Sequence, residues 1–204
     1  MKTKLERFAL ALLIAPLAPL AGLLGGWWLS YDLLPDTWIA PAAISGLALG
    51  IVADILFLKR LLERAHRISL AFWLAALLFY AVGMFGFFMG VPIFNALLAL
   101  PAGFVVGSRL AYEAAGRKRV HSATLRTCIL TTVLMAITCA ASAWFALQSP
   151  STPSDIKGMF GLIFDITPAM IWGVILIGGA GLLAVNWALT AFSIRLTYRF
   201  LSTP

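Results

Sequence analysis

Residues 38–58, WIAPAAISGLALGIVADILFL, form an apolar stretch in which Asp54 is the one charged side chain. A helix needs about 20 mostly apolar residues to cross the roughly 30 Å of hydrocarbon in a bilayer. Only helices and closed barrels satisfy every backbone N–H and C=O group inside lipid. The stretch therefore predicts a transmembrane helix.

Five further stretches have the same character, and the short alternating strands of a membrane barrel do not occur. The chain of 204 residues is 62% hydrophobic and 11% charged, and its mean hydropathy is +0.97, more apolar than a soluble domain. We predict an all-α fold, a polytopic integral membrane protein with a single six-helix transmembrane domain over residues 1–204. The predicted spans are residues 8–29, 38–58, 68–89, 92–112, 124–147 and 168–193.

The basic residues fall on one side of these spans. All 15 Lys and Arg residues except Lys157 lie near the chain ends, between the second and third spans, or around the connection between the fourth and fifth. Cytoplasmic segments of membrane proteins retain Lys and Arg. We therefore expect a multi-pass protein of the cell membrane with both termini in the cytoplasm.

The formal net charge of +7 follows from the same arrangement. Basic residues beside apolar spans attract anionic lipid headgroups at the cytoplasmic face, and the sequence leaves no soluble basic domain to bind nucleic acid. We expect membrane lipids as partners, and a partner membrane protein or a second copy of the chain as further candidates.

The connection between the third and fourth spans is short. Only Gly90 and Val91 separate them, and Pro92 suits a first helical turn because it lacks the N–H that would be unpaired there. This pattern predicts a tight outer hairpin. Asn95, near the outer end of the fourth span, is expected to stabilise that hairpin.

The connection between the fifth and sixth spans, residues 148–167, is longer and partly apolar. Its apolar residues recur at helical spacing, which predicts a short helix over residues 154–164 lying on the outer membrane surface. Ser154 would accept a hydrogen bond from an early backbone N–H of this helix. The apolar residues are Ile156, Met159, Phe160, Ile163 and Phe164.

Four polar residues within the spans, Asp54, Arg109, Thr131 and Asn186, outline a candidate pocket open towards the cytoplasm. Ionisable groups inside a membrane are costly and are functional candidates by default. Asp54 and Arg109 lie at similar depth, and a pair between them would remove both isolated charges from lipid. Alternatively, Arg109 pairs with Glu113 along its own helix while Asp54 reaches interfacial water.

Two patterns bear on how the helices around this pocket pack. Small residues spaced four apart on the second and fourth spans favour contact between those helices, because they let backbones approach closely in lipid. A polar stripe on the fifth span either lines a hydrated path or bonds to its own backbone and a neighbouring helix. The small residues are Ala42, Gly46, Gly50, Ala99, Gly103, Gly107 and Ala111, and the polar stripe is Thr124, Thr127, Cys128, Thr131, Thr138 and Ser142.

Common catalytic signatures are missing from the sequence. His66 and His121 fall in basic connections, where we expect solvated side chains, so the spans hold no Ser-His or Cys-His pair. A pair of facing intramembrane carboxylates is also missing, since Asp54 is the one acidic residue deep in a span. No His-Glu-x-x-His, Gly-x-Ser-x-Gly or phosphate-binding loop occurs. We expect a protein that is not an enzyme and has no cofactor or metal site.

Two functions fit these observations. The first is a transporter or channel for a small solute or ion, with Asp54 as binding or coupling carboxylate, Arg109 as its partner and the fifth span lining the path. The second is a non-catalytic membrane subunit or scaffold that packs against a partner membrane protein through its small-residue faces.

The topology can be tested with single cysteines in a background without native cysteines. A cysteine at Ser154 should react with a membrane-impermeant reagent added to intact cells, whereas cysteines at Ser122 and Ser202 should react only after the membrane is opened. The charge asymmetry is the reason for this expectation. Labelling at Ser122 from outside would contradict the predicted orientation.

Overall fold

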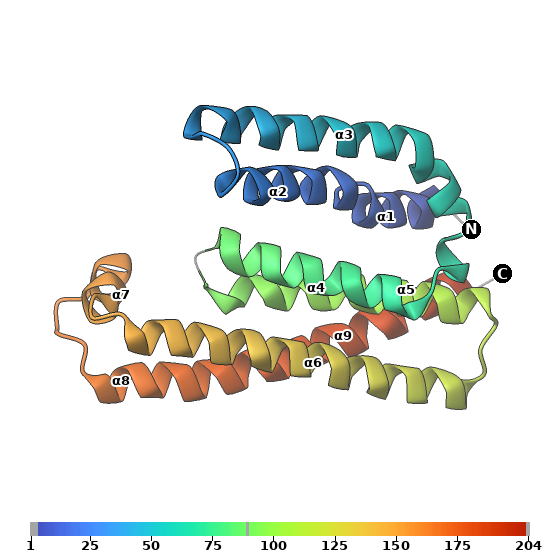
Figure 1. Ribbon diagram of the computed structural model, residues 1–204. Helices are drawn as coiled ribbons and strands as arrows, with labels where there is room; N and C mark the ends of the chain where they lie inside the picture. Colours follow the sequence, from blue (N-terminus) through green and yellow to red (C-terminus); the bar gives the residue numbers. More distant parts are fainter. Residues whose placement is uncertain (1–3, 89, 203–204) are drawn as a thin grey trace. The chain divides into compact units, whose positions relative to one another are not determined.

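A computed structural model describes residues 4–88 and 90–202, and this part of the chain is helical without strands (Figure 1). It contains six helices or helix pairs that are long and apolar enough to cross a membrane: Lys4–Tyr31, Asp36–Glu63, Leu70–Phe87, Pro92–Tyr112, Arg117–Gln148 and Pro168–Ser202. The prediction of six apolar helices is thus confirmed, and they support an integral membrane protein.

These spans are built from the following elements. The first contains α1 (Lys4–Ile14) and α2 (Leu17–Tyr31), the second is α3 (Asp36–Glu63), and the third is α4 (Leu70–Phe87), preceded by the 3₁₀ turn η1 (Ala65–Arg67). The fourth contains the 3₁₀ helix η2 (Pro92–Leu98) and α5 (Ala99–Tyr112), and the fifth is α6 (Arg117–Gln148). A short α7 (Thr152–Phe160) precedes the sixth, which consists of α8 (Pro168–Gly173), a π-helical turn η3 (Val174–Gly178) and α9 (Gly179–Ser202).

Several helices continue past the predicted spans at the basic ends. The fifth begins at Arg117 instead of residue 124, the sixth continues to Ser202, and the second continues to Glu63. Charged side chains do not interrupt a helix, because Lys, Arg and Glu are good helix formers. Hydropathy therefore finds the lipid-crossing part of a helix and misses its polar extension. The predicted end of the third span, Met89, lies outside the described residues.

The chain divides into two compact units, residues 1–76 and 77–204, with the division inside α4. In the first unit α2 and α3 are antiparallel neighbours along most of their length (Figure 1). A Cβ atom added at Gly22 would overlap the carbonyl oxygen of Gly46, and one added at Gly50 would overlap that of Ala18. The two backbones are thus in direct contact, which in lipid is a main source of helix–helix attraction.

The first span changes character at Pro16, between α1 and α2. Proline has no backbone N–H and cannot complete the helical hydrogen bond to the residue four positions earlier. The ladder continues on either side, since Ala15 N donates to Ala11 O and Leu20 N donates to Pro16 O. Pro16 therefore divides one membrane span into two helical segments.

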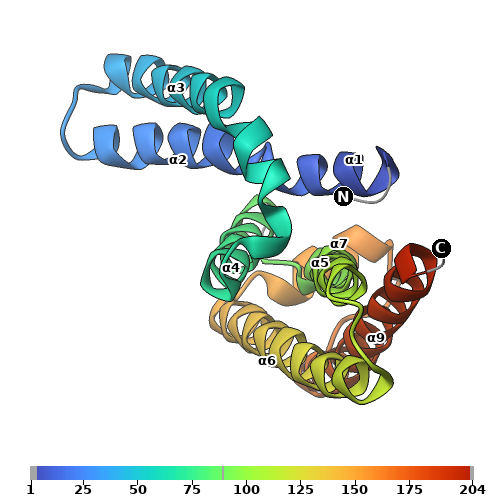
Figure 2. The same ribbon diagram turned by 90° about the vertical axis from the view of Figure 1, so that its right-hand side faces the viewer.

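In the second unit α9 packs against both α5 and α6, and Figure 2 shows these three helices side by side. Gly103 faces the Ser193 side chain and the Thr190 carbonyl, and Gly107 faces Ile194 and Thr197. Ser193 Oγ donates to Leu100 O at 2.7 Å. The α5–α9 contact thus combines close backbone approach with a hydrogen bond between helices.

The tight hairpin between the third and fourth spans is present. Pro92 lies in the first turn of η2, and Gly90 adopts a φ of +79°, which glycine tolerates without steric cost. Asn95 Nδ2 donates to Ala81 O of α4 at 2.9 Å, and the rings of Phe88 and Phe94 stack with centroids 3.8 Å apart. The role predicted for Asn95 in this hairpin is confirmed.

The helix predicted over residues 154–164 exists with different ends. It begins at Thr152 and stops at Phe160, because Gly161 takes a left-handed conformation that terminates the helix. The predicted cap is also wrong, since Ser154 Oγ donates to Ser151 O instead of accepting from a backbone N–H. The position of α7 on the outer membrane surface stays a prediction, and the side chains of Met159 and Phe160 lie outside the description.

The expected contact between the small-residue faces of the second and fourth spans is wrong. The face of α3 that carries Gly46 and Gly50 packs on α2, and the face of α5 that carries Gly103 and Gly107 packs on α9. Each face is occupied by the backbone of a helix in its own unit. Spacing predicted the close contacts but could not identify the partner helices.

Glycine substitutions on α2 test these backbone contacts. Gly22→Ala should destabilise the protein by about 1–3 kcal/mol, because the added methyl overlaps backbone that cannot move independently. The measurement is unfolding of the purified protein in detergent. Gly25→Ala is the matched control, since Gly25 has open space around it, and it should have no destabilising effect because Ala favours helix over Gly by about 1 kcal/mol. Equal losses from both substitutions would contradict the packing.

Candidate functional site

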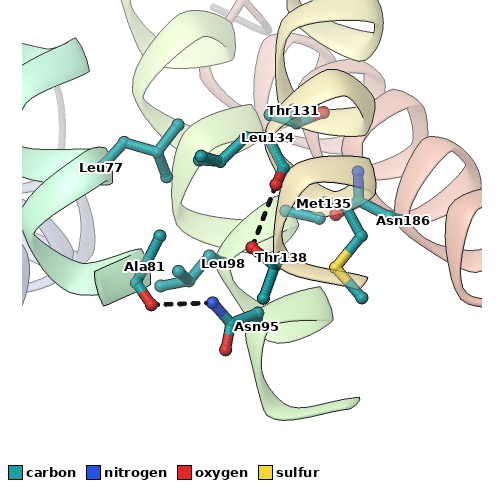
Figure 3. A pocket seen from close by; sticks show the side chains of 10 residues that line it. Leu77, Ala81, Asn95, Leu98, Thr131, Leu134, Met135, Thr138 and Asn186 are labelled. Carbon is teal, nitrogen blue, oxygen red and sulfur yellow. Dashed lines mark hydrogen bonds between the residues drawn. The ribbon is translucent and has the colours of Figure 1, made fainter. Parts of the chain in front are cut away.

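A small cavity lies in the second unit among η2, α4, α5, α6 and α9 (Figure 3). Its volume is about 10 Å³, counted as the space open to the centre of a water-sized sphere, which is about the space that one water molecule needs. Most of the lining is apolar. The lining residues are Leu77, Ala81, Asn95, Leu98, Ala99, Thr131, Leu134, Met135, Thr138 and Asn186.

Three helical elements bring polar side chains to this cavity. Asn95 comes from η2, Thr131 and Thr138 come from α6, and Asn186 comes from α9. All four are buried, with exposed fractions of 2% to 8%. Figure 3 shows Asn95 and Thr138 approaching from different helices. The polar lining is thus a product of tertiary packing.

The two asparagines have acceptor groups to spare. Asn95 Oδ1 is buried and has no hydrogen-bond partner among the described residues. Asn186 Nδ2 lies 3.5 Å from Thr132 Oγ1, a long contact, and no hydrogen bond to Asn186 Oδ1 is formed within the described part of the chain. A buried acceptor without a donor, such as Asn95 Oδ1, is unfavourable by about 1–3 kcal/mol. The surroundings of this cavity therefore favour a guest that donates hydrogen bonds or carries positive charge.

A hydrogen-bond chain links α6 to α9 beside the cavity. The hydroxyls of Thr131 and Thr190 are 2.9 Å apart, and Thr190 Oγ1 is also 2.9 Å from Asn186 O. A hydroxyl has one hydrogen to donate. Because the Asn186 carbonyl can only accept, Thr190 donates to it. Thr131 then has one hydrogen for two acceptors, Thr190 Oγ1 and, at 3.2 Å, Cys128 O of its own helix. Cys128 Sγ adds a weaker contact of 3.8 Å to Trp187 O.

Three further hydroxyls of the polar stripe on α6 bond within that helix. Thr124 donates to Val120 O, Thr127 to Ala123 O and Thr138 to Leu134 O. Such bonds to the carbonyl four residues earlier let a hydroxyl enter apolar surroundings at little cost. The interpretation that these hydroxyls bond their own backbone or a neighbouring helix is confirmed for the four threonines of the stripe, two of which line the cavity.

The predicted pocket residues fall in two places. Thr131 and Asn186 line the same cavity in the second unit. Asp54 belongs to the first unit and Arg109 to the second, so a pair between them stays a prediction. Arg109 Nε lies 3.1 Å from Glu113 Oε1, as the alternative assignment expected.

Two cavity residues were not singled out as pocket residues from the sequence. Asn95 was assigned to the hairpin alone, and Thr138 was one member of a longer stripe. Sequence gave a usable signal for both, since each is a polar residue inside an apolar span. The sequence did not show that these residues lie close together in space, because Asn95, Thr138 and Asn186 come from three separate spans.

The expectation of solvated histidines is wrong for His66. Its Nε2 lies 2.9 Å from Glu6 Oε1, and both side chains are almost fully buried, with exposed fractions of 7% and 3%. The 3₁₀ turn η1 places His66 beside the start of α1 instead of in an open loop. His121, at an exposed position on α6, agrees with the expectation of a solvated side chain.

The connection around α7 carries a separate ion pair. Lys157 Nζ lies 2.6 Å from Asp165 Oδ1, and this hydrogen bond lowers the pKa of the Asp165 carboxyl below its ordinary value. Asp165 is almost fully exposed, so water and salt screen the pair and its contribution to stability is small.

Comparison with known proteins adds no family to these observations: no family model, no curated protein and no solved structure matches the chain. Among the described residues, no group of three or more His, Cys, Asp or Glu side chains could hold a metal ion. Functional inference therefore depends on the geometry of the two units.

The link between Thr131 and Thr190 can be measured by a double-mutant cycle. Thr131→Val, Thr190→Val and the double mutant should show a coupling of about 0.6 kcal/mol, the average for such bonds between membrane helices. The measurement is unfolding in detergent. Thr124→Val combined with Thr190→Val is the control and should show no coupling, because Thr124 bonds to Val120 of its own helix. Additive effects for the Thr131 pair would contradict the assigned bond.

Proposed function

We propose that this integral membrane protein is a transporter or channel for a small solute or ion. The observation that carries the proposal is the cavity of the second unit, where Asn95, Thr131, Thr138 and Asn186 meet inside otherwise apolar spans. Polar groups within a membrane are costly, and polar residues that face a cavity inside the helix bundle are candidates for a pathway or a binding position. The fifth span, α6, would line the path.

The chemistry of the cavity supports passage of a small polar guest. The asparagine carbonyl oxygens provide acceptors, and the threonine oxygens can accept in addition to the bonds that they donate. A cavity of about one water volume admits a water-sized guest in this conformation. Passage of anything larger requires the helices around it to separate.

An irregular helical segment at the cavity supports the same proposal. Asn95 lies in η2, a 3₁₀ segment within the fourth span. Irregular backbone at membrane depth is tolerated where it is buried in protein or lines a water-filled space.

The alternative function, a subunit that docks through its small-residue faces, receives less support. Gly46 and Gly50 on α3 and Gly103 and Gly107 on α5 already contact other helices of the same unit. A partner protein could not use these faces without displacing α2 or α9. Docking on another surface stays open to test.

The environment of the protein is part of the proposal. It would lie in the cell membrane with both termini in the cytoplasm, and its basic segments would contact anionic headgroups. Asp54 would serve as a binding or coupling carboxylate, and Arg109, now beside Glu113, would be its partner in another state.

The proposal can be tested with the full chain in liposomes that contain neutral and anionic phospholipids. Osmotic swelling in urea or glycerol and dye-reported fluxes of H⁺, Na⁺ and K⁺ are the probes, and at least one should exceed protein-free liposomes. Asn186→Leu fills the cavity with an apolar side chain and should reduce that flux tenfold or more.

A matched pair of threonine variants separates the path from general damage. Thr138→Val changes a cavity residue, whereas Thr127→Val makes the same change on α6 at a residue that does not line the cavity. Both hydroxyls bond to a carbonyl of their own helix. Flux should fall in the first and persist in the second. No flux for any probe from folded, reconstituted protein would overturn the proposal in favour of the subunit function, as would unchanged flux in Asn186→Leu.

A further inference from the structure

Asp54 lies in the apolar part of α3 and does not line the cavity of the second unit. Its side chain is half-buried, and no hydrogen bond or ion pair reaches it from the described residues of its own unit. Lys59 and Arg60, the nearest basic residues on its helix, are exposed and form no ion pair with it. A membrane carboxylate without a partner calls for a compensating positive group.

The packing of α3 on the first span shows what lies near Asp54. Gly46 is in contact with Gly22, and Gly50 with Ala18 and Pro19. The two helices are therefore antiparallel, and later residues of α3 lie beside earlier residues of the first span. Asp54 follows Gly50 by one helical turn and lies on the same side of α3. One turn before Ala18 and Pro19, the first span reaches Ala15 and Pro16.

This part of the first span has backbone acceptors that the helix does not use. Pro16 and Pro19 lack the N–H groups that would bond to the carbonyls of Leu12 and Ala15, four residues earlier. Ala15 shares the α3-facing side with Pro19 and Gly22, which are four and seven residues further on. Its carbonyl oxygen therefore lies on the side of the span from which Asp54 approaches.

We propose that Asp54 and the Ala15 carbonyl oxygen, which Pro19 leaves without its helical donor, bind a monovalent metal cation of sodium size. Interrupted membrane helices offer such carbonyls as ligands for Na⁺. One carboxylate balances one positive charge, whereas a divalent ion would leave a net charge in apolar surroundings. Oxygen ligands also suit a hard cation.

The cation site deepens the proposed transport function in one respect. The role of the ion as a coupling ion rests on that function, whereas its binding to the first unit does not. Binding can therefore be measured on the detergent-solubilised full chain, with no flux assay. Loss of flux with intact sodium binding, or the reverse, separates failure of one proposal from failure of the other.

The test compares thermal unfolding midpoints in NaCl, KCl and choline chloride at equal ionic strength and neutral pH. A ligand that binds only the folded state raises the midpoint, and NaCl should raise it by about 3 °C over choline chloride for a chain of this size. Asp54→Asn should abolish the difference. Asp36→Asn, at the other end of α3, is the matched control and should retain it.

A proline variant tests the carbonyl ligand separately. Pro19→Ala restores an N–H that can bond to Ala15 O, so it should reduce the sodium effect by half or more while Asp54 is still present. Pro41→Ala removes another helix-interior proline, on the far part of α3, and should leave the sodium effect unchanged.

Three results would overturn the cation site. They are equal midpoints in the three salts for the wild-type chain, a sodium effect that survives Asp54→Asn, and stabilisation by acid alone, which would mean that Asp54 takes a proton instead. If Asp54→Asn does not fold, the wild-type comparison and the Pro19→Ala variant still decide. An unchanged sodium effect in Pro19→Ala would remove the carbonyl from the proposal.

Discussion

Close contact between helix backbones is the constraint on which the rest of this structure depends. Lipid gives little hydrophobic drive for helices to associate, so packing and hydrogen bonds between them must hold the units together. Gly22 against Gly46 and Gly103 against Ser193 leave no space for a Cβ atom. Because α2 and α3, and α5 and α9, are fixed in this way, the polar side chains beside these contacts acquire definite neighbours.

The two units handle polar groups differently. In the second unit, hydroxyls are satisfied by their own helix or by a neighbour, as in the chain from Thr131 through Thr190 to Asn186. What stays unsatisfied, Asn95 Oδ1, lies at the cavity. In the described part of the first unit, no hydrogen bond or ion pair to Asp54 is formed, and Pro16 and Pro19 cannot donate to the carbonyls of Leu12 and Ala15. The candidate sites thus lie where regular helix geometry leaves polar groups without a partner.

Prolines and irregular turns interrupt the regular α-helical backbone within the spans. Pro16 divides the first span, Pro92 starts a 3₁₀ segment that places Asn95 against α4, and η3 interrupts the sixth span. Each feature frees or redirects backbone groups that a continuous helix would pair internally. They lie on spans whose remaining turns are held by side-chain packing, so the deviations are local.

The sequence by itself determined the six apolar spans and the tight hairpin at Gly90, because hydropathy and residue spacing act within one helix. For the α6 hydroxyls it left two alternatives, a hydrated path and bonds to their own or a neighbouring helix. It also identified Thr131 and Asn186 as polar residues of interest. Only the tertiary structure decided that Asn95 and Thr138 join them, that the glycine faces of α3 and α5 pack on α2 and α9, and that His66 is buried against Glu6. These outcomes depend on which helices are neighbours, and that choice results from shape complementarity between whole helix surfaces, which spacing along one helix does not specify.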